Sequence, residues 1–523
     1  MPLKETIKTV GQLLANEISA AVGYQQSFEE LLAKNDVPRA IAMLVNHSTT
    51  AEEHLREYNI GNHKIIQRPG RNIYDKQGKF LYTKDLNTIA IPYQKFINEV
   101  ALVFLYGRPV LWKNSTKNPD GVERDQLKQQ LDTMEEGAEG NEAIEKRIAE
   151  IDAATAKTDD LYNNLIKRLK EARFDAHLRE AKRYAGCEGC SALLFHTYRD
   201  DNGEAQLLIR TLAKSKKDDI YTLFDQYDRL VAFAWGYNTK DSEGNSVRHY
   251  DVYTKDTIYR CEQAHFGNWV SNLEPNPVGK IPVIVFRQEV EWEGAEKMIE
   301  RVEKATSINA DTIDDFGTPA VVATGEITNA QDLVQQEEES KLFELRNGGD
   351  LKYLELQNIG ESRQKEIQLL ESQIMEKTFT PTITLEALRG LSNASGATLR
   401  TVMMLAFIKA DRRKDSHDGL LSRVSSLMKA IMGKVLDVPG GSGYDTLAIE
   451  HEFQEPFGAD IAQTFGDLMK QYGAGVISMR TVLEQSYLVP NAEKEMERLN
   501  QEQAKKAEQQ RQNLLQDVFA QVE

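Results

Sequence analysis

The stretch that decides the fold is Lys280–Phe316, KIPVIVFRQEVEWEGAEKMIERVEKATSINADTIDDF. Its first part, KIPVIVFRQ, is a short apolar run that predicts a buried strand. From Gly294 to Phe316 the apolar residues recur at helical spacing and form one stripe, whereas the acidic residues lie mostly elsewhere. We therefore expect a helix with one packed face and one acidic face. The stripe consists of Met298, Val302, Ala305 and Ile308, and the acidic residues are Glu296, Glu300, Glu303, Asp311 and Asp315.

Strand patterns precede this segment and helical patterns surround it. Residues 191–287 alternate between apolar and polar positions, and Asp201-Asn202-Gly203 is a turn signal, so an antiparallel sheet is expected there. The run NTIAIPYQKFINEVALVFLYGRPVLW predicts a helix from about Tyr93 to Leu105. Further helices are expected over residues 161–186, 361–375 and about 396–435, and an alternating strand in LAIEHEFQ. The fold class is α+β and predominantly helical.

Residues 116–160 are charged and rich in Ala, Glu, Lys and Gln. QLKQQLDTMEE and EAIEKRIAEID are two helical pieces around the spacer GAEGNE. This pattern predicts an exposed antiparallel helical hairpin.

Composition narrows the classes of function. The 523 residues carry 64 basic and 81 acidic side chains, for a net charge of −17, which disfavours tight nonspecific binding to nucleic acid. No apolar run approaches the ~20 residues of a membrane span, and the N-terminus does not resemble a signal peptide. Three cysteines are too few for a disulfide scaffold. We expect a soluble, unexported, multidomain protein without membrane contact.

Two motifs suggest chemistry. The stretch LSNASGATLRTVMMLAF, Leu391–Phe407, resembles a phosphate-binding loop, but Ala397 stands where the required lysine would be, so a loop entering a helix is expected instead. A C-x-x-C pair followed far downstream by C-x-x-x-H could bind zinc, although small packed side chains explain the same residues. These residues are Cys187, Cys190, Cys261 and His265.

Other catalytic signals are weak. Acidic pairs and runs such as Asp314-Asp315 could bind magnesium, but solvated charge is the commoner explanation. No G-x-S-x-G or H-E-x-x-H motif occurs in the chain. We expect no cofactor, no catalytic residue and no enzymatic activity, and a metal-dependent enzyme is the alternative.

Several segments, in this order, resemble the portal proteins of long-tailed bacteriophages. The resemblance covers about residues 50–500 and rests on the ordered set of segments, because none of them is diagnostic alone. The charged hairpin at 116–160 departs from the common pattern of the family. The similar segments are YNIGNHKIIQRPG, NTIAIPYQKFINEVALVFLYGRPVLW, RYAGCEGCSALLFHTYRDDNGE, the opening Lys280–Phe316, LSNASGATLRTVMMLAF, IEHEFQEP and GVISMRTVLEQSYLVPNAEKEMERLNQE.

The resemblance implies a ring-forming portal fold with wing, stem, clip and crown regions. It assigns residues 1–293 to the wing, 294–316 and 358–376 to two stem helices, 317–357 to the clip, 377–395 to a tunnel loop, 396–455 to a long wing helix and strand, and 456–523 to crown helices and a tail. It implies tunnel-loop residues Lys377, Thr380, Thr382, Arg389, Ser392 and Asn393, with Lys377 and Arg389 near the lumen, and clip residues Glu337, Glu338, Lys341 and Arg346.

The function implied by the resemblance is a dodecameric channel for double-stranded DNA at one capsid vertex of the virion, assembled in the host cytoplasm. Its implied partners are further copies of itself, the terminase large subunit, the major capsid or scaffolding protein, and a head-tail adaptor protein. Twelve chains of −17 would surround the duplex with a like-charged wall. Such a wall is expected to let DNA slide rather than hold it.

Overall fold

The structure is a computed structural model that describes most of the chain. The described residues are 28–75, 77–116, 121–133, 141–263, 267–316, 320–327, 345–354, 359–381, 401–456, 461–485, 495–496, 498–502 and 505–506. The chain divides into two compact units. Unit 1 comprises Met1–Ile383 and Met403–Phe453, and unit 2 comprises Thr384–Val402 and Gln454–Glu523.

The predicted antiparallel sheet is present, but as two antiparallel sheets. One has six strands in the order β1-β7-β8-β9-β10-β11, and the other has three in the order β12-β5-β6. The turn at Asp200 is encoded locally, because its Oδ1 accepts hydrogen bonds from the backbone N–H groups of Asn202 and Glu204 at 3.0 and 2.9 Å. The strands are β1 (Val45–Asn46), β5 (Cys190–Arg199), β6 (Ala205–Leu212), β7 (Asp219–Phe224), β8 (Leu230–Lys240), β9 (Ser246–Tyr253), β10 (Thr257–Gln263), β11 (Trp269–Pro275) and β12 (Val283–Arg287).

Successive residues of a strand point to opposite sides of its sheet, so each sheet has two different faces. The two sheets pack face to face through the apolar side chains on one face of each. Along β5, Ala192 and Leu194 face the six-stranded sheet and pack against Phe233 and Tyr253. The outer face of the six-stranded sheet is covered by α2 (Val37–Ala42) and neighbouring apolar residues.

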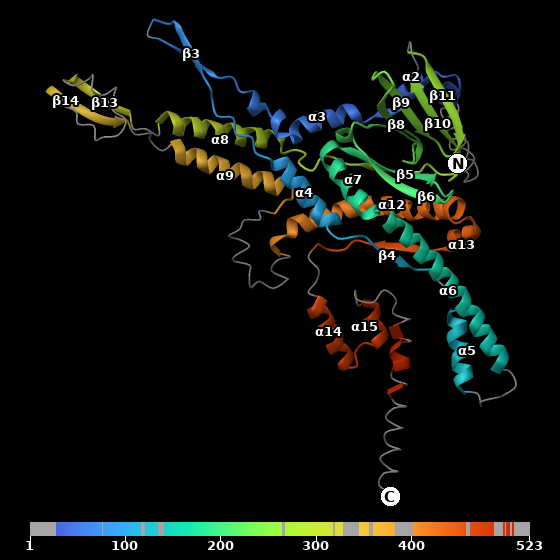
Figure 1. Ribbon diagram of the computed structural model, residues 1–523. Coiled ribbons are helices and arrows are strands. Elements are labelled where there is room, and N and C mark those ends of the chain that lie inside the picture. Colours follow the sequence, from blue (N-terminus) through green and yellow to red (C-terminus); the bar gives the residue numbers. More distant parts are fainter. Residues whose placement is uncertain are drawn as a thin grey trace, which may run out of the picture. The chain divides into compact units, whose positions relative to one another are not determined.

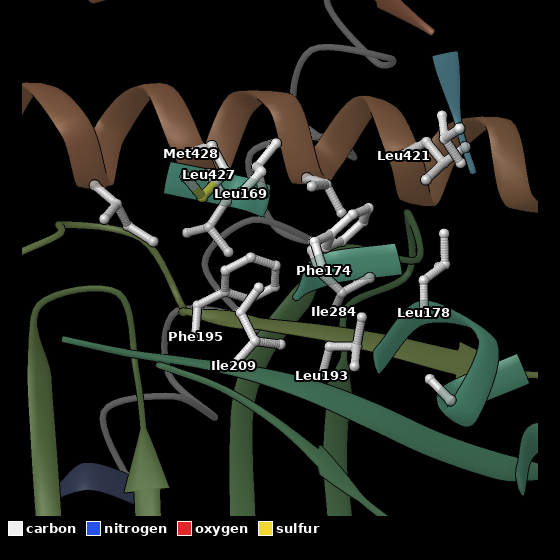
Figure 2. Close-up of a cluster of buried hydrophobic side chains, with 14 of the residues drawn as sticks. Leu169, Phe174, Leu178, Leu193, Phe195, Ile209, Ile284, Leu421, Leu427 and Met428 are labelled. Atoms are coloured by element: carbon white, nitrogen blue, oxygen red, sulfur yellow. The ribbon is translucent and has the colours of Figure 1, made fainter. Parts of the chain in front are cut away.

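The other face of the three-stranded sheet forms the largest core. Figure 2 shows helix α12 (Met404–Ile431) lying across the sheet, with Phe174, Phe195 and Leu427 between the two. Helix α7 (Phe174–Glu188) contributes Leu178 and Ala185 to the same core. The centre of unit 1 is therefore a stack of two sheets with helices on both outer faces.

The charged helical hairpin is confirmed. It consists of α5 (Gly121–Thr133) and α6 (Asn141–Glu171), which lie side by side in Figure 1 and are joined by the Arg147–Glu123 ion pair at 2.9 Å. Helix α6 is longer than predicted and inserts Leu165 and Leu169 into the largest core. The prediction of a single helix over residues 161–186 is wrong, because α6 ends at Glu171 and α7 begins at Phe174. Arg173 adopts a left-handed conformation, with φ 54°, and separates α6 from α7.

The helix predicted from Gly294 to Phe316 is present as α8 (Glu296–Phe316), and it packs against α9 (Ile359–Lys377). Ile299 and Val302 of α8 and Ile374 of α9 share a core with Trp292, which lies just before α8. Strands β13 (Ala320–Ile327) and β14 (Leu345–Leu354), whose positions follow α8 and precede α9 in the chain, pair as an antiparallel hairpin. Helix α4 (Tyr93–Tyr106), also predicted, adds Tyr93 and Ile97 to the α8 core.

The long helix α12 begins at Met404, and a π-helical turn, Met432–Leu436, continues it. The predicted start near residue 396 lies outside the described residues. The strand predicted in LAIEHEFQ is present as β15 (Ile449–Glu452), and it pairs with β4 (Leu111–Asn114). The remaining elements of unit 1 are α3 (Ser48–Tyr58), β2 (Arg71–Tyr74), β3 (Phe80–Lys84), α13 (Gly441–Thr446) and the 3-10 turns Ile60–Asn62, Lys64–Gln67, Lys214–Lys216 and Val438–Gly440.

In its described part, unit 2 contains helices α14 (Ile461–Gly473) and α15 (Met479–Gln485). They pack against each other, with Leu468 and Val482 buried. Both fall within the region where the C-terminal helices were expected.

Candidate functional site

The candidate site is the face of α8 that carries the predicted acidic residues. A segment from Ile60 to Ile91, which we call the arm, runs along this face. The arm includes the 3-10 turns after α3 and the β2–β3 hairpin. Backbone N–H groups of the arm donate to α8 side chains, from Ile89 to Ser307 Oγ and from Ile91 to Glu303 Oε1, both at 2.9 Å. The arm is thus fixed to the helix by its backbone as well as by its charges.

Glu303 is the most buried of the predicted acidic residues, with 2% of its surface exposed. Its carboxylate accepts the His63 Nδ1 hydrogen bond at 2.6 Å, and His63 is itself buried. The hydrogen bond to Glu303 raises the pKa of His63 above its ordinary value, against the opposing effect of burial. This pair is the buried centre of the contact between the arm and α8.

Asp311 and Asp315 bind the part of the arm at the base of the β2–β3 hairpin. Asp311 forms an ion pair with Arg68 at 2.7 Å and accepts the backbone N–H of Asn87 at 2.7 Å. Burial alone would raise the pKa of Asp311, but these two interactions hold it below its ordinary value. The hydrogen bond from Lys84 lowers the pKa of Asp315, and Arg71 also pairs with that carboxylate, at 3.3 Å.

The acidic face is therefore not a free acidic surface. Four of the five predicted carboxylates have a basic partner from the arm, including Glu300, which pairs with Lys64 at 2.5 Å. Glu296 differs, because its Oε1 accepts the backbone N–H of Gly294 at 2.9 Å, before the start of α8. The predicted acidic face therefore lies against the arm, and its residues Glu300, Glu303, Asp311 and Asp315 are paired with it.

The α8 residues that remain exposed are mainly basic. Lys297, Arg301 and Lys304 recur at helical spacing, and the Lys297 side chain is 83% exposed. Arg301 reaches across to Glu366 of α9 at 2.7 Å. The solvent-facing stripe of this helix thus has the opposite sign to the one expected.

The contact between the arm and α8 should weaken as pH rises. The pKa of His63 is raised in the folded state. Protonation of His63 therefore stabilises the fold fully at pH values below its pKa in the unfolded state, about 6.5. This stabilisation is lost as pH rises through the pKa of the folded state. We expect His63→Gln to lower the thermal unfolding midpoint more at about pH 6 than at about pH 9, with a cost of about 1–3 kcal/mol at the lower pH.

Thermal unfolding of both proteins, followed by circular dichroism across this range, measures the effect. The matched control is His249→Gln in β9, because His249 is a partly buried histidine whose Nε2 lies 2.7 Å from Thr239 Oγ1, and its exchange should leave the contact between the arm and α8 unchanged. An equal loss for His63→Gln at both pH values would contradict the assigned role of His63.

The predicted tunnel-loop residues are only partly described. Lys377 is the last residue of α9 and is exposed. Thr380 is 1% exposed, and its hydroxyl lies 2.9 Å from that of Thr378 while its N–H donates to Met375 O at 2.8 Å. Thr380 therefore caps the end of α9, which contradicts its assignment to a surface that faces DNA. Thr382, Arg389, Ser392 and Asn393 lie outside the described residues.

Among the predicted clip residues, Arg346 lies in β14, opposite Glu326 of β13. Glu337, Glu338 and Lys341 lie outside the described residues.

The three cysteines of the zinc alternative are not brought together. Each is buried in a different apolar core: Cys187 beside Trp292, Cys190 between the two sheets, and Cys261 under α2. Burial raises the pKa of Cys190 to about 12 and that of Cys261 to about 11, so neither is a ready thiolate ligand. Within the described ranges, no group of three or more His, Cys, Asp or Glu residues has a metal-binding arrangement. His265 lies outside them.

The structure also contains a buried ionic cluster that was not predicted from the sequence. The side chain of Glu291, just before α8, is fully buried and pairs with Lys182 of α7. Lys409 and Arg413 of α12 approach the same carboxylate at 2.9 and 3.6 Å, and Gln288 donates to it at 2.7 Å. Burial alone would raise the pKa of Glu291, but the basic neighbours hold it well below its usual range. The sequence feature that could have indicated this cluster is Lys182, a charged residue on the apolar face of α7.

A family model described as "Phage portal protein, SPP1 Gp6-like" matches residues 49–509, and the chain therefore belongs to this phage portal protein family. A search of curated proteins gave no significant match. Among solved structures, the neck of a native GTA particle computed with C12 symmetry is similar at 11% identity and a TM-score of 0.37, over 76% of this chain and 90% of that one.

Family membership makes this protein a structural, non-enzymatic component of a phage particle. It removes the metal-dependent enzyme as an explanation of the cysteines. None of the helices in the described part of the chain combines the length and hydropathy that a membrane-spanning segment requires.

Proposed function

We propose that identical copies of this chain form a closed ring of twelve around a channel for double-stranded DNA at one capsid vertex. The family match over residues 49–509 carries this proposal. The ring would admit DNA during packaging and release it during ejection. The head-to-tail symmetry of such a ring requires two different complementary surfaces on each chain.

In this proposal the helical pair α8–α9 is the stem, and the β13–β14 hairpin belongs to the clip. The sheets, α4 and α12 belong to the wing, and α14–α15 to the crown. The chain order of helix, β-hairpin and helix supports the stem and clip assignments, because it places the hairpin between two packed helices. Residues 377–395 remain our proposed tunnel loop, with Lys377 and Arg389 near the lumen.

The charge pattern of α8 changes how the proposed channel would treat DNA. Since four carboxylates of α8 are paired with the arm, the stem itself would be close to neutral. The repulsion would then come from the remaining acidic residues of a chain with a net charge of −17. The exposed Lys297 and Arg301 are themselves paired, with Glu300 and Glu366, so the stem would offer few free cations to bind phosphate and would still let the duplex slide.

The proposed partners are the terminase large subunit and a head-tail adaptor protein at the clip, and the major capsid or scaffolding protein at the outer surface. The place of action is the virion, after assembly in the host cytoplasm. The DNA contact would be independent of sequence.

The decisive experiment is native mass measurement of the purified full chain together with electron-microscope images along the particle axis. We expect closed rings with a central hole wide enough for a duplex. A chain that remains monomeric at all concentrations and salt conditions, or rings whose centre is closed, would end the proposal.

A further inference from the structure

The tip of the arm is a β-hairpin whose shape is specified by its own sequence. Strands β2 and β3 pair antiparallel, with Ile73 opposite Tyr82, and form a sheet of two strands only. In the turn, Asp75 Oδ1 accepts the backbone N–H groups of Gln77 and Lys79 at 2.9 and 2.8 Å, and Gly78 has φ 80°. The hairpin is therefore a defined element, although an isolated two-stranded sheet is at best marginally stable in water.

This small hairpin exposes a concentrated set of large apolar side chains. Tyr74 and Phe80 make an edge-on ring contact, with centroids 6.1 Å apart, yet each is more than half exposed. Soluble chains rarely leave contiguous apolar patches uncovered unless they mark a site of interaction. The exposed residues are Tyr74 at 56%, Phe80 at 51%, Leu81 at 54% and Tyr82 at 56%.

The root of the hairpin is firmly held. Arg71 at the start of β2 and Lys84 at the end of β3 both pair with Asp315, near the C-terminal end of α8. At Gly70 the two legs of the hairpin approach so closely that a Cβ atom would lie 2.6 Å from Thr83 Cγ2 and 2.8 Å from Lys84 O. A fixed root means that the exposed tip is presented in one direction, which lowers the entropic cost of binding a partner.

The charge of the arm indicates what kind of surface it fits. Residues 64–84 contain six Lys or Arg residues and one acidic residue, in a chain whose net charge is −17. Within its own chain, the arm already binds an acidic helix face. The surface complementary to a basic and aromatic hairpin is therefore acidic and apolar. On α8, the exposed Asp314 lies next to the exposed Ile313, and a second copy of the chain presents the same two residues.

We propose that the β2–β3 hairpin packs on the uncovered side of α8 in a neighbouring copy of the chain, around Ile313. This inference rests on the proposed ring. Ring symmetry places equivalent residues at the same height, so a hairpin rooted at Asp315 meets its neighbour near residue 315 if it extends sideways. Ile313 is 61% exposed. It lies two residues from Asp311 and from Asp315, or about 200° around the helix from each, on the side away from the arm.

The two sides of α8 then supply the two surfaces that a head-to-tail ring needs. One side holds the chain's own arm, and the other receives the hairpin of the next copy. Ile313 continues the sector of α8 that, about three and four turns earlier, is covered by the core at Val302 and Ile299.

Disulfide trapping tests this contact directly in the full chain. We expect the double variant Tyr82→Cys/Ile313→Cys, oxidised after assembly, to give a ladder of covalent multimers on a non-reducing gel. The three native cysteines are buried and should not react. The matched control is Tyr82→Cys/Lys304→Cys, because Lys304 is exposed on a different side of α8. A ladder from the control but not from the first variant would overturn the proposal.

A second variant tests the energetic role of the hairpin. Phe80→Ser/Leu81→Ser/Tyr82→Ser changes only exposed positions, so the monomer should keep its thermal unfolding midpoint while the yield of rings falls at least about tenfold. Normal rings from this variant, with no ladder from Tyr82→Cys/Ile313→Cys, overturn the inference and leave the ring proposal intact. If the wild-type chain itself stays monomeric, both fail.

Discussion

Replacing Glu291 by Gln is expected to destabilise unit 1 by about 3–5 kcal/mol, the range found when one partner of a buried ion pair is removed. The Glu291 carboxylate is the only negative charge among the groups that the structure brings to this cluster. Without it, Lys182, whose side chain is 1% exposed, keeps its positive charge in an apolar surrounding or must lose its proton. Either outcome is costly, so the thermal unfolding midpoint should fall by several degrees.

The matched control for this exchange is Glu289→Gln, two residues away. Glu289 is exposed, and the contact with Arg413 uses its backbone oxygen rather than its side chain. Its exchange should change the free energy of unfolding by less than about 0.5 kcal/mol. Adding Lys182→Met to Glu291→Gln should recover part of the loss, because it removes one unpaired buried cation. If Glu291→Gln and Glu289→Gln unfold at the same urea concentration, the cluster does not stabilise unit 1.

The second large effect is expected from Asp311→Ala, which should release the arm from α8. The exchange leaves the Arg68 side chain, 19% exposed, without its carboxylate, and the backbone N–H of Asn87 without its acceptor. A loss of about 2–3 kcal/mol would follow from a broken charged hydrogen bond and an unpaired group. Since 1.4 kcal/mol is a factor of ten, amide hydrogen exchange at Ile89 and Ile91 should accelerate by about thirty- to 150-fold.

Hydrogen exchange followed by mass spectrometry of peptides that cover residues 86–92 measures this release. Asp85→Ala is the control, because Asp85 is an exposed acid in the same arm. The charge swap Arg68→Asp/Asp311→Arg should restore part of the protection. Unchanged exchange in Asp311→Ala would mean that other contacts, such as Glu303 with Ile91, hold the arm without help from Asp311.

Elements with a regular apolar period were predictable from the sequence. Helices α4, α8 and α9 were expected within a few residues of where they lie, and the α5–α6 hairpin was also expected, although α6 extends further than predicted. In each case the periodicity of one segment records which of its faces is buried. The break between α6 and α7 was not predictable, because Arg173 adopts a left-handed conformation without the glycine or proline that usually signals a break.

The pairing of strands from distant segments also could not be predicted from the sequence. The strand β15 was expected, but its partner β4 lies more than 300 residues earlier in the chain. Likewise, residues 191–287 were expected to form one sheet, since alternation shows that two faces differ but not which strands share a sheet.

The candidate site shows the same limit for charges. The sequence located the acidic residues on the correct helix, but it could not show that His63, Lys64 and Arg68 would neutralise them from about 240 positions upstream. Nor did a lone lysine at position 182 reveal the carboxylate of Glu291. For the three cysteines the sequence suggested one shared site, but the structure places them in three different cores.

By itself, the sequence determined the local elements, the acidic balance and the resemblance to portal proteins. These properties depend on residues near one another in the chain, or on composition, and need no knowledge of packing. Only the tertiary structure decided which charges are paired and which remain exposed. That choice depends on contacts between segments hundreds of residues apart, and it turned the exposed stripe of α8 from acidic to basic.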